Sequence, residues 1–354
     1  GVVSPKGFKA VGIKAGLKRS RSHDMMLLVS DVPAQFAAAF TPNKFAAPPV
    51  LYCQELATSA DTVRAIIVNS GNANACTGRR GMTDARRMAE QTAESLQHAT
   101  SENVEANEVF VSSTGRIGVP LPMEKVLNGI QVAACELSSD MKMNEGAARA
   151  IMTTDTVPKF CAASIDIGGV TVTIGGMTKG AGMIAPQLKP AGLHATMLAY
   201  MTTDAVIEKD VLRACLADSL DASFNRINID GDMSTNDTFI VLANGQAGNA
   251  SIRANTFEAE LFQKAFNRVA GELARKMVMD GEGVTRFVTL NVTGAKDKAE
   301  ARTCADWIAR SLLCKTAWFG ADPNWGRILA AVGYAGVEVN TDRTMMDYDG
   351  TPVV

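Results

Sequence analysis

Short apolar segments alternate along the chain with longer segments in which apolar residues recur every three to four positions. The short segments are rich in β-branched residues and predict strands at Met25–Val29, Ala65–Val68, Val109–Ser112, Ala162–Ile167, Val170–Ile174, Phe239–Ala243 and Val288–Val292. The longer segments predict helices at residues 83–98, 121–137, 206–223, 257–279 and 298–313. Strands and helices mixed at this spacing favour an α/β or α+β fold.

Two of the predicted helices begin with the pattern of a capping box. Asn255 is followed three residues later by Glu258, and Asp297 is followed by Glu300. The helix predicted after Asn255 has one apolar face, made of Leu261, Phe262, Phe266, Val269 and Leu273. We therefore expect this helix to pack against a core.

Composition excludes some classes of partner. Apolar residues make up 47% of the 354 residues, which is ample for a core, and the formal net charge of −2 gives no electrostatic case for nucleic acid or an anionic membrane. The densest basic cluster comprises Lys14, Lys18, Arg19, Arg21 and His23. A solvated turn is the favoured interpretation of this cluster, with an anion site as the alternative.

The cysteines and histidines limit the chemistry further. Seven cysteines without a CxxC spacing indicate reduced thiols in a cytosol-like compartment. Three histidines provide poorly for a histidine-based metal centre or a Ser-His-Asp triad. No apolar run in the sequence reaches the roughly 18 residues of a membrane span, and the first residues do not match a signal peptide. We expect a cytoplasmic protein, or one of an organelle matrix in a eukaryote.

The most informative pattern lies between Lys179 and Leu198. Lys179 precedes a glycine-rich stretch, and Thr196 follows the small residue Ala195. A hydroxyl group is a weak nucleophile without a base, but a threonine at a new chain end carries its own α-amine, which titrates at about pH 7 to 8. Cutting the Ala195–Thr196 bond would create this residue, and the Pro- and Gly-rich segment 180–193 is the best candidate for an exposed, cleavable loop.

Four further features have two interpretations each. Residues 112–115 are either a strand-ending turn or an oxyanion-binding pair of a hydroxyl group and a glycine N–H. Residues 152–156 are either a turn or part of a polar pocket. Residues 280–283 are either a plain helix end or a turn that presents Glu282 to an ammonium group. His194 is either a loop residue or a general base.

Three other motifs point to structure. Gly180 and Gly182 do not have the spacing of a phosphate-binding loop. Residues 230–237 lack the glycine and the final glutamate of a calcium-binding EF-hand, so a hydrogen-bonded turn before a strand is favoured. Residues 322–327 predict a turn and a helix that begins near Trp325, with Arg327 facing either a substrate carboxylate or a structural acid.

The order of these motifs resembles the ornithine acetyltransferase family, the glutamate N-acetyltransferases of arginine biosynthesis. The resemblance is carried by residues 7–12, 69–78, 113–115, 150–156, 179–184, 195–198, 202–205, 230–237, 280–283, 315–317 and 322–327. It implies an α/β fold of the DmpA/ornithine acetyltransferase type, functionally akin to N-terminal-nucleophile enzymes.

The resemblance also implies the roles of individual residues. The precursor would cut itself between Ala195 and Thr196 into an α chain, residues 1–195, and a β chain, residues 196–354, which stay associated as a heterotetramer. Thr196 would be the nucleophile. Thr114 and Gly115 would form the oxyanion hole. The substrate would contact Thr153, Lys179, Thr196 and Glu282.

The implied reaction follows a ping-pong scheme. N-acetylornithine would acetylate Thr196 and release ornithine, after which glutamate would take up the acetyl group. Acetyl-CoA is an alternative donor, and neither a metal nor another cofactor is expected. The resemblance gives no nucleic-acid or membrane partner.

Two departures from the family pattern keep other interpretations open. Residues 187–194 intervene between the glycine-rich stretch and Ala195, and the sequence stops at Val354, so we expect a C-terminal portion to be missing. The alternatives are an amidohydrolase or aminopeptidase with the same nucleophile, and an inactive truncated homologue.

Overall fold

A computed structural model describes residues 1–100, 103–190 and 197–354. Its contacts divide the chain into two compact units, Gly1–Glu282 and Gly283–Val354. The predicted cleavage site, Ala195 and Thr196, lies outside the described residues, as does His194. The division into chains 1–195 and 196–354 therefore stays a prediction.

The first unit is built on one mixed sheet. Its described strands are β1 (Phe8–Ile13), β2 (Met25–Phe40), β3 (Val63–Asn72), β4 (Val109–Arg116), β5 (Lys159–Ile167), β6 (Val170–Lys179), β7 (Lys189–Pro190), β8 (Leu198–Thr203) and β9 (Thr238–Ala243). The strand order is β4-β3-β2-β9-β8-β6-β5, with β1 and β7 also paired to β2. The pairs β3–β4 and β8–β9 are parallel, and the other pairs are antiparallel.

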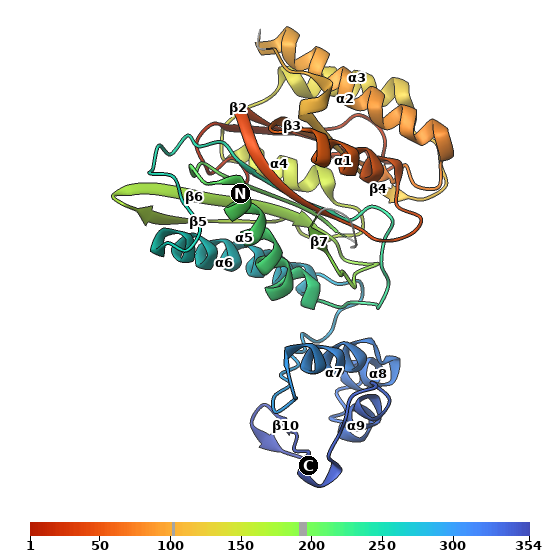
Figure 1. Ribbon diagram of the computed structural model, residues 1–354. Coiled ribbons are helices and arrows are strands. Elements are labelled where there is room, and N and C mark those ends of the chain that lie inside the picture. Colours follow the sequence, from red (N-terminus) through yellow and green to blue (C-terminus); the bar gives the residue numbers. More distant parts are fainter. Residues whose placement is uncertain (101–102, 191–196) are drawn as a thin grey trace. The chain divides into compact units, whose positions relative to one another are not determined.

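Strand β2 carries the sheet from one layer to a second. Its first part pairs with β1 and β3, its register shifts between Val29 and Ala34, and its last part pairs with β9. One buried cluster contains Ile66 and Val68 of β3 together with Tyr200 of β8 and Leu242 of β9. The two halves of the sheet therefore pack face to face, as the ribbon shows (Figure 1).

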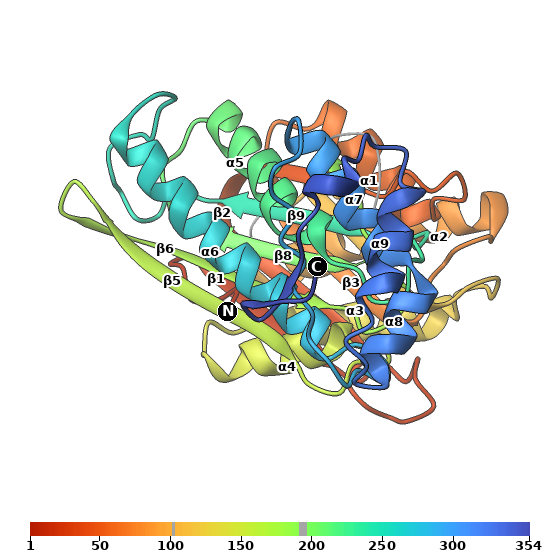
Figure 2. The ribbon, with the colours of Figure 1, turned by 90° about the horizontal axis from the view of Figure 1, so that it is seen from below.

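Helices cover both outer faces of this double layer. The described α-helices of the unit are α1 (Pro48–Ser59), α2 (Gly78–Thr100), α3 (Met123–Cys135), α4 (Lys142–Ile151), α5 (Lys209–Ala222) and α6 (Phe257–Met279). Because side chains alternate along a strand, Ala65 and Ile67 of β3 point away from the inner cluster and pack with α2 and α3. Helices α5 and α6 pack on the opposite face (Figure 2). The expected α/β architecture is confirmed.

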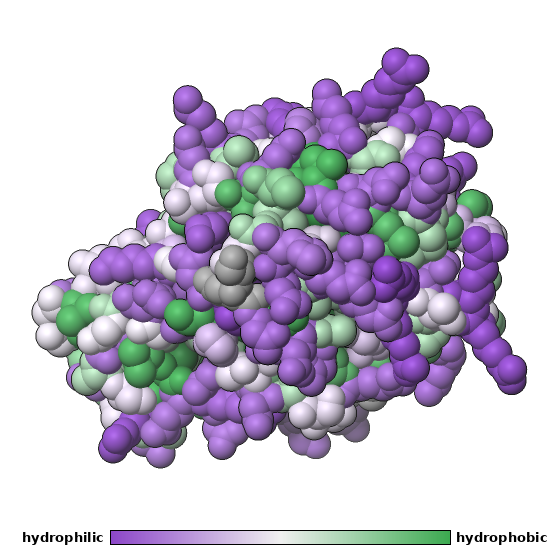
Figure 3. Space-filling view, turned by 90° about the horizontal axis from the view of Figure 1, so that it is seen from above, coloured by the Kyte–Doolittle hydropathy of each residue, from purple (hydrophilic) through white to green (hydrophobic). Residues whose placement is uncertain are grey.

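The outer helices are amphipathic. Met88 and Leu96 of α2 are buried, whereas Glu94 is exposed and Arg87 is partly exposed. Seen from above, the surface of the molecule is mostly hydrophilic with scattered apolar side chains (Figure 3). None of the described helices is long and apolar enough to cross a membrane.

The helix starts agree with the predictions in one of two cases. Asp297 caps α7 (Lys298–Arg310), since its side chain accepts a hydrogen bond from the Glu300 N–H. The prediction for Asn255 is wrong, because Thr256 caps α6 by accepting from the Ala259 N–H at 3.2 Å. Asn255 instead has a left-handed backbone with φ of 60°, which asparagine tolerates better than most residues.

The second unit is a small helical body. It contains α7, α8 (Leu312–Phe319), α9 (Trp325–Gly333) and the hairpin β10 (Asp347–Tyr348) and β11 (Thr351–Pro352). Asn324 caps α9, as the turn predicted before Trp325 requires. Arg327 donates to the Leu313 carbonyl and the Thr316 hydroxyl group, which are structural contacts within the unit.

The predicted strand Val288–Val292 is wrong. These residues have no strand conformation, although Leu290 and Val292 pack against the apolar cluster of the second unit. A β-branched apolar run becomes a strand only where a neighbouring strand takes its backbone hydrogen bonds, and no described strand pairs with this segment. Short 3₁₀-helices complete the described elements, at Ala106–Glu108, Phe224–Arg226 and Thr341–Arg343.

Candidate active site

Three strand ends meet where the most informative sequence pattern lies. Lys179 is the last residue of β6 and pairs with Leu198, the first residue of β8. Leu198 also pairs with Thr238, the first residue of β9. The N–H group of Thr238 donates to the Met197 carbonyl at 2.7 Å. The residues just after the predicted nucleophile are thus fixed beside Lys179, although Thr196 itself lies outside the described residues.

Lys179 joins the two halves of the sheet. Its Nζ donates to Oγ1 of Thr114 at 3.2 Å, and each of the two residues is only 8% exposed. Thr114 lies near the end of β4, in the other half of the sheet from β6. Two predicted site residues that are 65 positions apart in sequence therefore touch.

The charge of Lys179 is balanced by acids. Burial lowers the pKa of its ammonium group below the ordinary value of 10.5, and the negative charges of Asp155, Asp237 and Glu282 act in the opposite direction. Asp237, directly before β9, is itself almost fully buried, and burial raises its pKa well above 3.8. The buried ammonium group of Lys179 therefore faces acids from three different segments.

Gly115 occupies a position that a larger residue cannot take. Its φ is 131°, and a Cβ atom there would lie 2.4 Å from the Gly71 carbonyl carbon. Ser113, two residues before Gly115, donates from Oγ to Oδ1 of Asn69 at 2.6 Å, and its carbonyl accepts from the Asn236 side chain at 2.8 Å. The segment is a tightly held continuation of β4, which runs to Arg116 and so past the predicted strand end.

Asp155 places Thr153 beside the glycine-rich loop. Its carboxylate accepts hydrogen bonds from the N–H groups of Thr153 at 3.0 Å and Gly180 at 2.6 Å. Burial alone would raise its pKa, but the charges of Lys179 and Lys159 outweigh burial and lower it to about 2. Thr153 is exposed at this point and Asp155 stays ionised beneath it.

Glu282 lies against the same loop. Its N–H donates to the Ala181 carbonyl at 2.7 Å, and a Cβ atom at Gly182 would lie 2.5 Å from its Oε1. Asp230 holds the far side of the loop by accepting from the N–H groups of Met183 and Ile184. The interpretation of residues 230–237 as a hydrogen-bonded turn agrees with these contacts.

Sequence reasoning missed Lys18 as a neighbour of the site. Its Cγ lies 3.1 Å from a Cβ position built at Gly71, and its Nζ donates to the His23 carbonyl at 2.7 Å. Burial lowers its pKa to about 8, with Asp24 opposing and Lys179 adding to the shift. Lys14, Arg19 and Arg21 of the basic cluster are exposed, whereas Lys18 and His23 are half-buried, so the turn is solvated only in part. The glycine at position 71 is the one sequence signal for this close packing.

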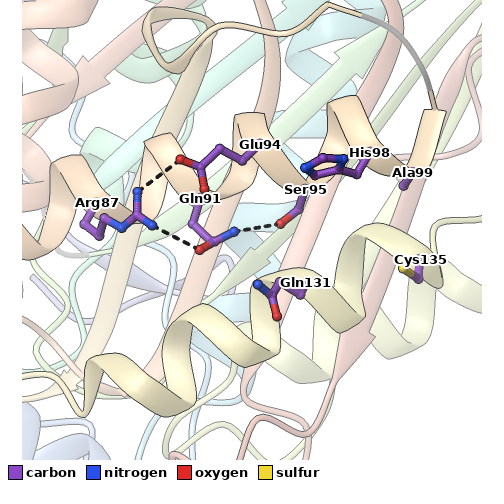
Figure 4. A pocket seen from close by; sticks show the side chains of 8 residues that line it. All are labelled: Arg87, Gln91, Glu94, Ser95, His98, Ala99, Gln131 and Cys135. Carbon is purple, nitrogen blue, oxygen red and sulfur yellow. Dashed lines mark hydrogen bonds and ion pairs between the residues drawn. The ribbon is translucent and has the colours of Figure 1, made fainter.

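A separate hollow lies on the outer helical layer. It has a volume of about 600 Å³ and is lined by side chains of α2 and α3, among them Gln91, His98 and Cys135 (Figure 4). Arg87 at its rim is already paired with Glu94 and Gln91. None of the predicted site residues lines it. Across the described part of the chain, no three His, Cys, Asp or Glu side chains are grouped to hold a metal ion.

Comparisons with known proteins agree with the resemblance. Residues 9–354 match the ArgJ family. The arginine biosynthesis bifunctional protein ArgJ of Caldanaerobacter subterraneus subsp. tengcongensis is 47% identical over 339 residues, which are 96% of this chain and 80% of that protein. Among solved structures, the ArgJ protein of Bacillus halodurans is 41% identical with a TM-score of 0.50, and the match covers 53% of this chain and 94% of that one.

A second solved structure is ornithine acetyltransferase of Mycobacterium tuberculosis in complex with ornithine. It is 41% identical, with a TM-score of 0.48, and the match covers 53% of this chain and 96% of that one. The family match and the identity to relatives confirm the predicted family, and with it an acyltransferase of arginine biosynthesis of the ornithine acetyltransferase class. The chain belongs to the ArgJ family.

Proposed function

We propose that Thr196 carries the acetyl group of this acyltransferase after the chain cuts itself between Ala195 and Thr196. The contact between Lys179 and Thr114 carries the proposal, because it joins a predicted substrate residue to the predicted oxyanion hole. Met197, one peptide bond after Thr196, is fixed beside this contact by the Thr238 N–H. The freed α-amine of Thr196 would serve as the base that activates its own hydroxyl group.

Thr114 and Gly115 form the proposed oxyanion hole. The close approach of Gly115 to Gly71 leaves no room for a side chain, so glycine is required at this position of the proposed oxyanion hole. The Thr114 hydroxyl group already accepts a hydrogen bond from Lys179, so its own proton is free to be donated. A donor of this kind lowers an acyl-transfer barrier by about 3 kcal/mol.

The charges around the loop fit the two amino-acid substrates. Lys179 offers an ammonium group for a carboxylate, and Glu282 offers a carboxylate for an ammonium group. Thr153 adds an exposed hydroxyl group beside Gly180. N-acetylornithine carries one carboxylate and one ammonium group, and glutamate carries the same pair with a second carboxylate. These residues are thus the proposed substrate contacts.

The proposed reaction exchanges two bonds at one acetyl carbon. The Thr196 hydroxyl oxygen attacks the acetyl carbonyl of N-acetylornithine, its proton passes through the α-amine to the departing nitrogen, and ornithine leaves. The amine of glutamate then attacks the acetyl ester and restores the hydroxyl group. Acetyl-CoA is proposed as a second donor to the same oxygen, and no cofactor takes part in these steps.

We also propose that the two chains stay together after cleavage. Residues 174–179 of β6 pair with residues 198–203 of β8, and β2 pairs with β9, so chains 1–195 and 196–354 would share one sheet. The proposed assembly is a heterotetramer of paired α and β chains. The proposed location is the cytoplasm, or an organelle matrix in a eukaryote.

The release of ornithine tests the proposed transfer. Purified protein is incubated with N-acetylornithine, with and without glutamate, and ornithine is measured. We expect steady release only when glutamate is present, and no release from Thr196→Ala. Equal release without glutamate would mean that water takes the acetyl group, which is the behaviour of a hydrolase.

A further inference from the structure

A buried lysine outside the proposed substrate contacts connects the segments that carry them. Lys159, the first residue of β5, is 1% exposed. Its Nζ donates to Asp155 Oδ1 at 2.6 Å and to Asp280 Oδ2 at 2.5 Å, and it lies 3.4 Å from the Val157 carbonyl. All three ammonium protons thus have acceptors within the protein, so Lys159 offers none to a ligand.

Each of the two acids organises a different backbone segment. Asp155 accepts from the N–H groups of Thr153 and Gly180, which ties the 153–156 turn to the end of β6. Asp280, at the end of α6, accepts from the N–H group of Thr156 at 3.0 Å and from its hydroxyl group. Glu282 follows two residues later on the same turn.

We propose that Lys159 is a positioning residue that sets Thr153, Lys179 and Glu282 in register for substrate binding. It acts through Asp155 and Asp280 and touches no substrate itself. The proposal rests on the proposed function, since it takes these three residues as the substrate contacts. Lys159 would thus hold together three segments that are distant in sequence.

Electrostatics favour a positioning role over a purely stabilising one. Burying a lysine with two carboxylates costs much of what their attraction returns, so such a cluster is no more stabilising than well-packed apolar residues of similar volume. The cluster instead fixes directions, because the two short ion pairs of Lys159 leave the groups little freedom. A shift of about 1 Å in a positioning group lowers activity by about a hundredfold. Once the resulting excess of negative charge is also removed, the loss of Lys159 should therefore affect substrate binding more than overall folding.

The test compares the single variant Lys159→Met with the double variant Lys159→Met/Asp280→Asn. The single variant leaves two buried carboxylates without the cation that they share, so we expect a lower melting temperature together with a KM raised about tenfold or more for N-acetylornithine and glutamate. The double variant removes the excess negative charge. We expect its melting temperature to recover toward that of the unaltered protein, while both KM values stay high because the link between the segments is still missing.

Lys276→Met provides a matched control. Lys276 donates to the carbonyl of Phe160, the neighbour of Lys159, at 2.9 Å, yet it contacts neither acid of the cluster. We expect its KM values to equal those of the unaltered protein. A double variant that recovers both its melting temperature and its KM values would overturn the positioning role, since Lys159 would then only balance charge.

Thr153→Ala and Glu282→Ala separate this inference from the proposed function. If both leave the KM values unchanged, the proposed substrate contacts are wrong. If both raise the KM values and Lys159→Met/Asp280→Asn does not, the contacts stand and the positioning role fails.

Discussion

The hydroxyl group of Thr114 contacts a buried ammonium group and is the proposed donor to the reacting carbonyl. It accepts from Lys179 at 3.2 Å and is almost fully buried, so little solvent competes for it. A hydrogen bond to a charged donor in such a place is stronger than one at the surface. The contribution of the Thr114 hydroxyl group to catalysis can therefore be tested separately from the packing of its side chain.

Thr114→Ala should lower kcat/KM about a hundredfold to a thousandfold, because the acyl-transfer barrier loses one preorganised donor. Thr114→Ser keeps the hydroxyl group and should lose much less. Initial rates with N-acetylornithine and glutamate check both variants. If the alanine variant were as active as the serine variant, Thr114 would not be part of the oxyanion hole.

Asp155 makes the stability of the first unit depend on pH in the acid range. The pKa of its carboxyl group is lowered from 3.8 to about 2 in the folded chain. Its contribution is therefore fully present above pH 3.8 and is lost as the pH falls toward 2. The size of this contribution is about 2 kcal/mol.

Asp155→Asn should be less stable than its parent by about this amount at neutral pH, and the difference should shrink as the pH falls toward 2. Denaturant unfolding in the Thr196→Ala background measures it on an uncut chain. Glu145→Gln, which alters an exposed ion pair on α4, is the control and should change little. A gap between Asp155→Asn and its parent that persists at pH 2 would contradict the lowered pKa.

At the scale of elements, the glycine-rich loop holds Glu282 by leaving space for it. A methyl group at Gly182 would lie 2.5 Å from the carboxylate oxygen of Glu282, which must then move. The Glu282 carboxylate is the mobile end of an exposed side chain, so a methyl group at Gly182 is expected to cost little in folding stability. The cost in binding is expected to be larger.

Gly182→Ala should therefore raise the KM for N-acetylornithine in the same direction as Glu282→Ala, with little change in melting temperature. The double variant should be no worse than Glu282→Ala alone, because both changes act on one carboxylate. If the two substitutions raised the KM additively in the double variant, Gly182 and Glu282 would act independently, which would contradict this account.

Six of the seven strands that the sequence pattern predicts are present in the structure. The errors of the prediction have physical causes. The second half of β2 is rich in alanine, a weak strand former, so its buried pairing with β9 gives little local signal. The alternating segment Val288–Val292 has the right pattern but no partner strand among the described elements. Whether a segment forms a strand depends on partner strands that are distant in sequence, so a short stretch of sequence cannot predict it alone.

The site shows the same limit. Thr114, Gly115, Thr153, Lys179 and Glu282 follow from the family motifs, and the structure brings Thr114 to Lys179 and Glu282 to the glycine-rich loop. Lys159 gives no such signal, because a lysine at the start of a strand resembles an exposed edge residue. Its burial follows from two acids, one of them 121 positions away, which only the tertiary fold brings to it.

At the scale of the whole molecule, the proposed cleavage would separate the sequence but leave the sheet continuous. Strands β6 and β8 lie on opposite sides of the Ala195–Thr196 bond, and their backbones are paired from Ile174–Thr203 to Lys179–Leu198. The shared sheet buries apolar side chains on both faces. A cut chain is therefore expected to keep the site intact.

Intact mass under denaturing conditions, after incubation with N-acetylornithine and without glutamate, tests the central claim most directly. We expect two chains that end at Ala195 and begin at Thr196, with the second heavier by one acetyl group until glutamate is added. Thr196→Ala should remain a single chain without added mass. A single uncut mass that is the same for both proteins, or an acetyl group on a residue other than Thr196, would contradict the account.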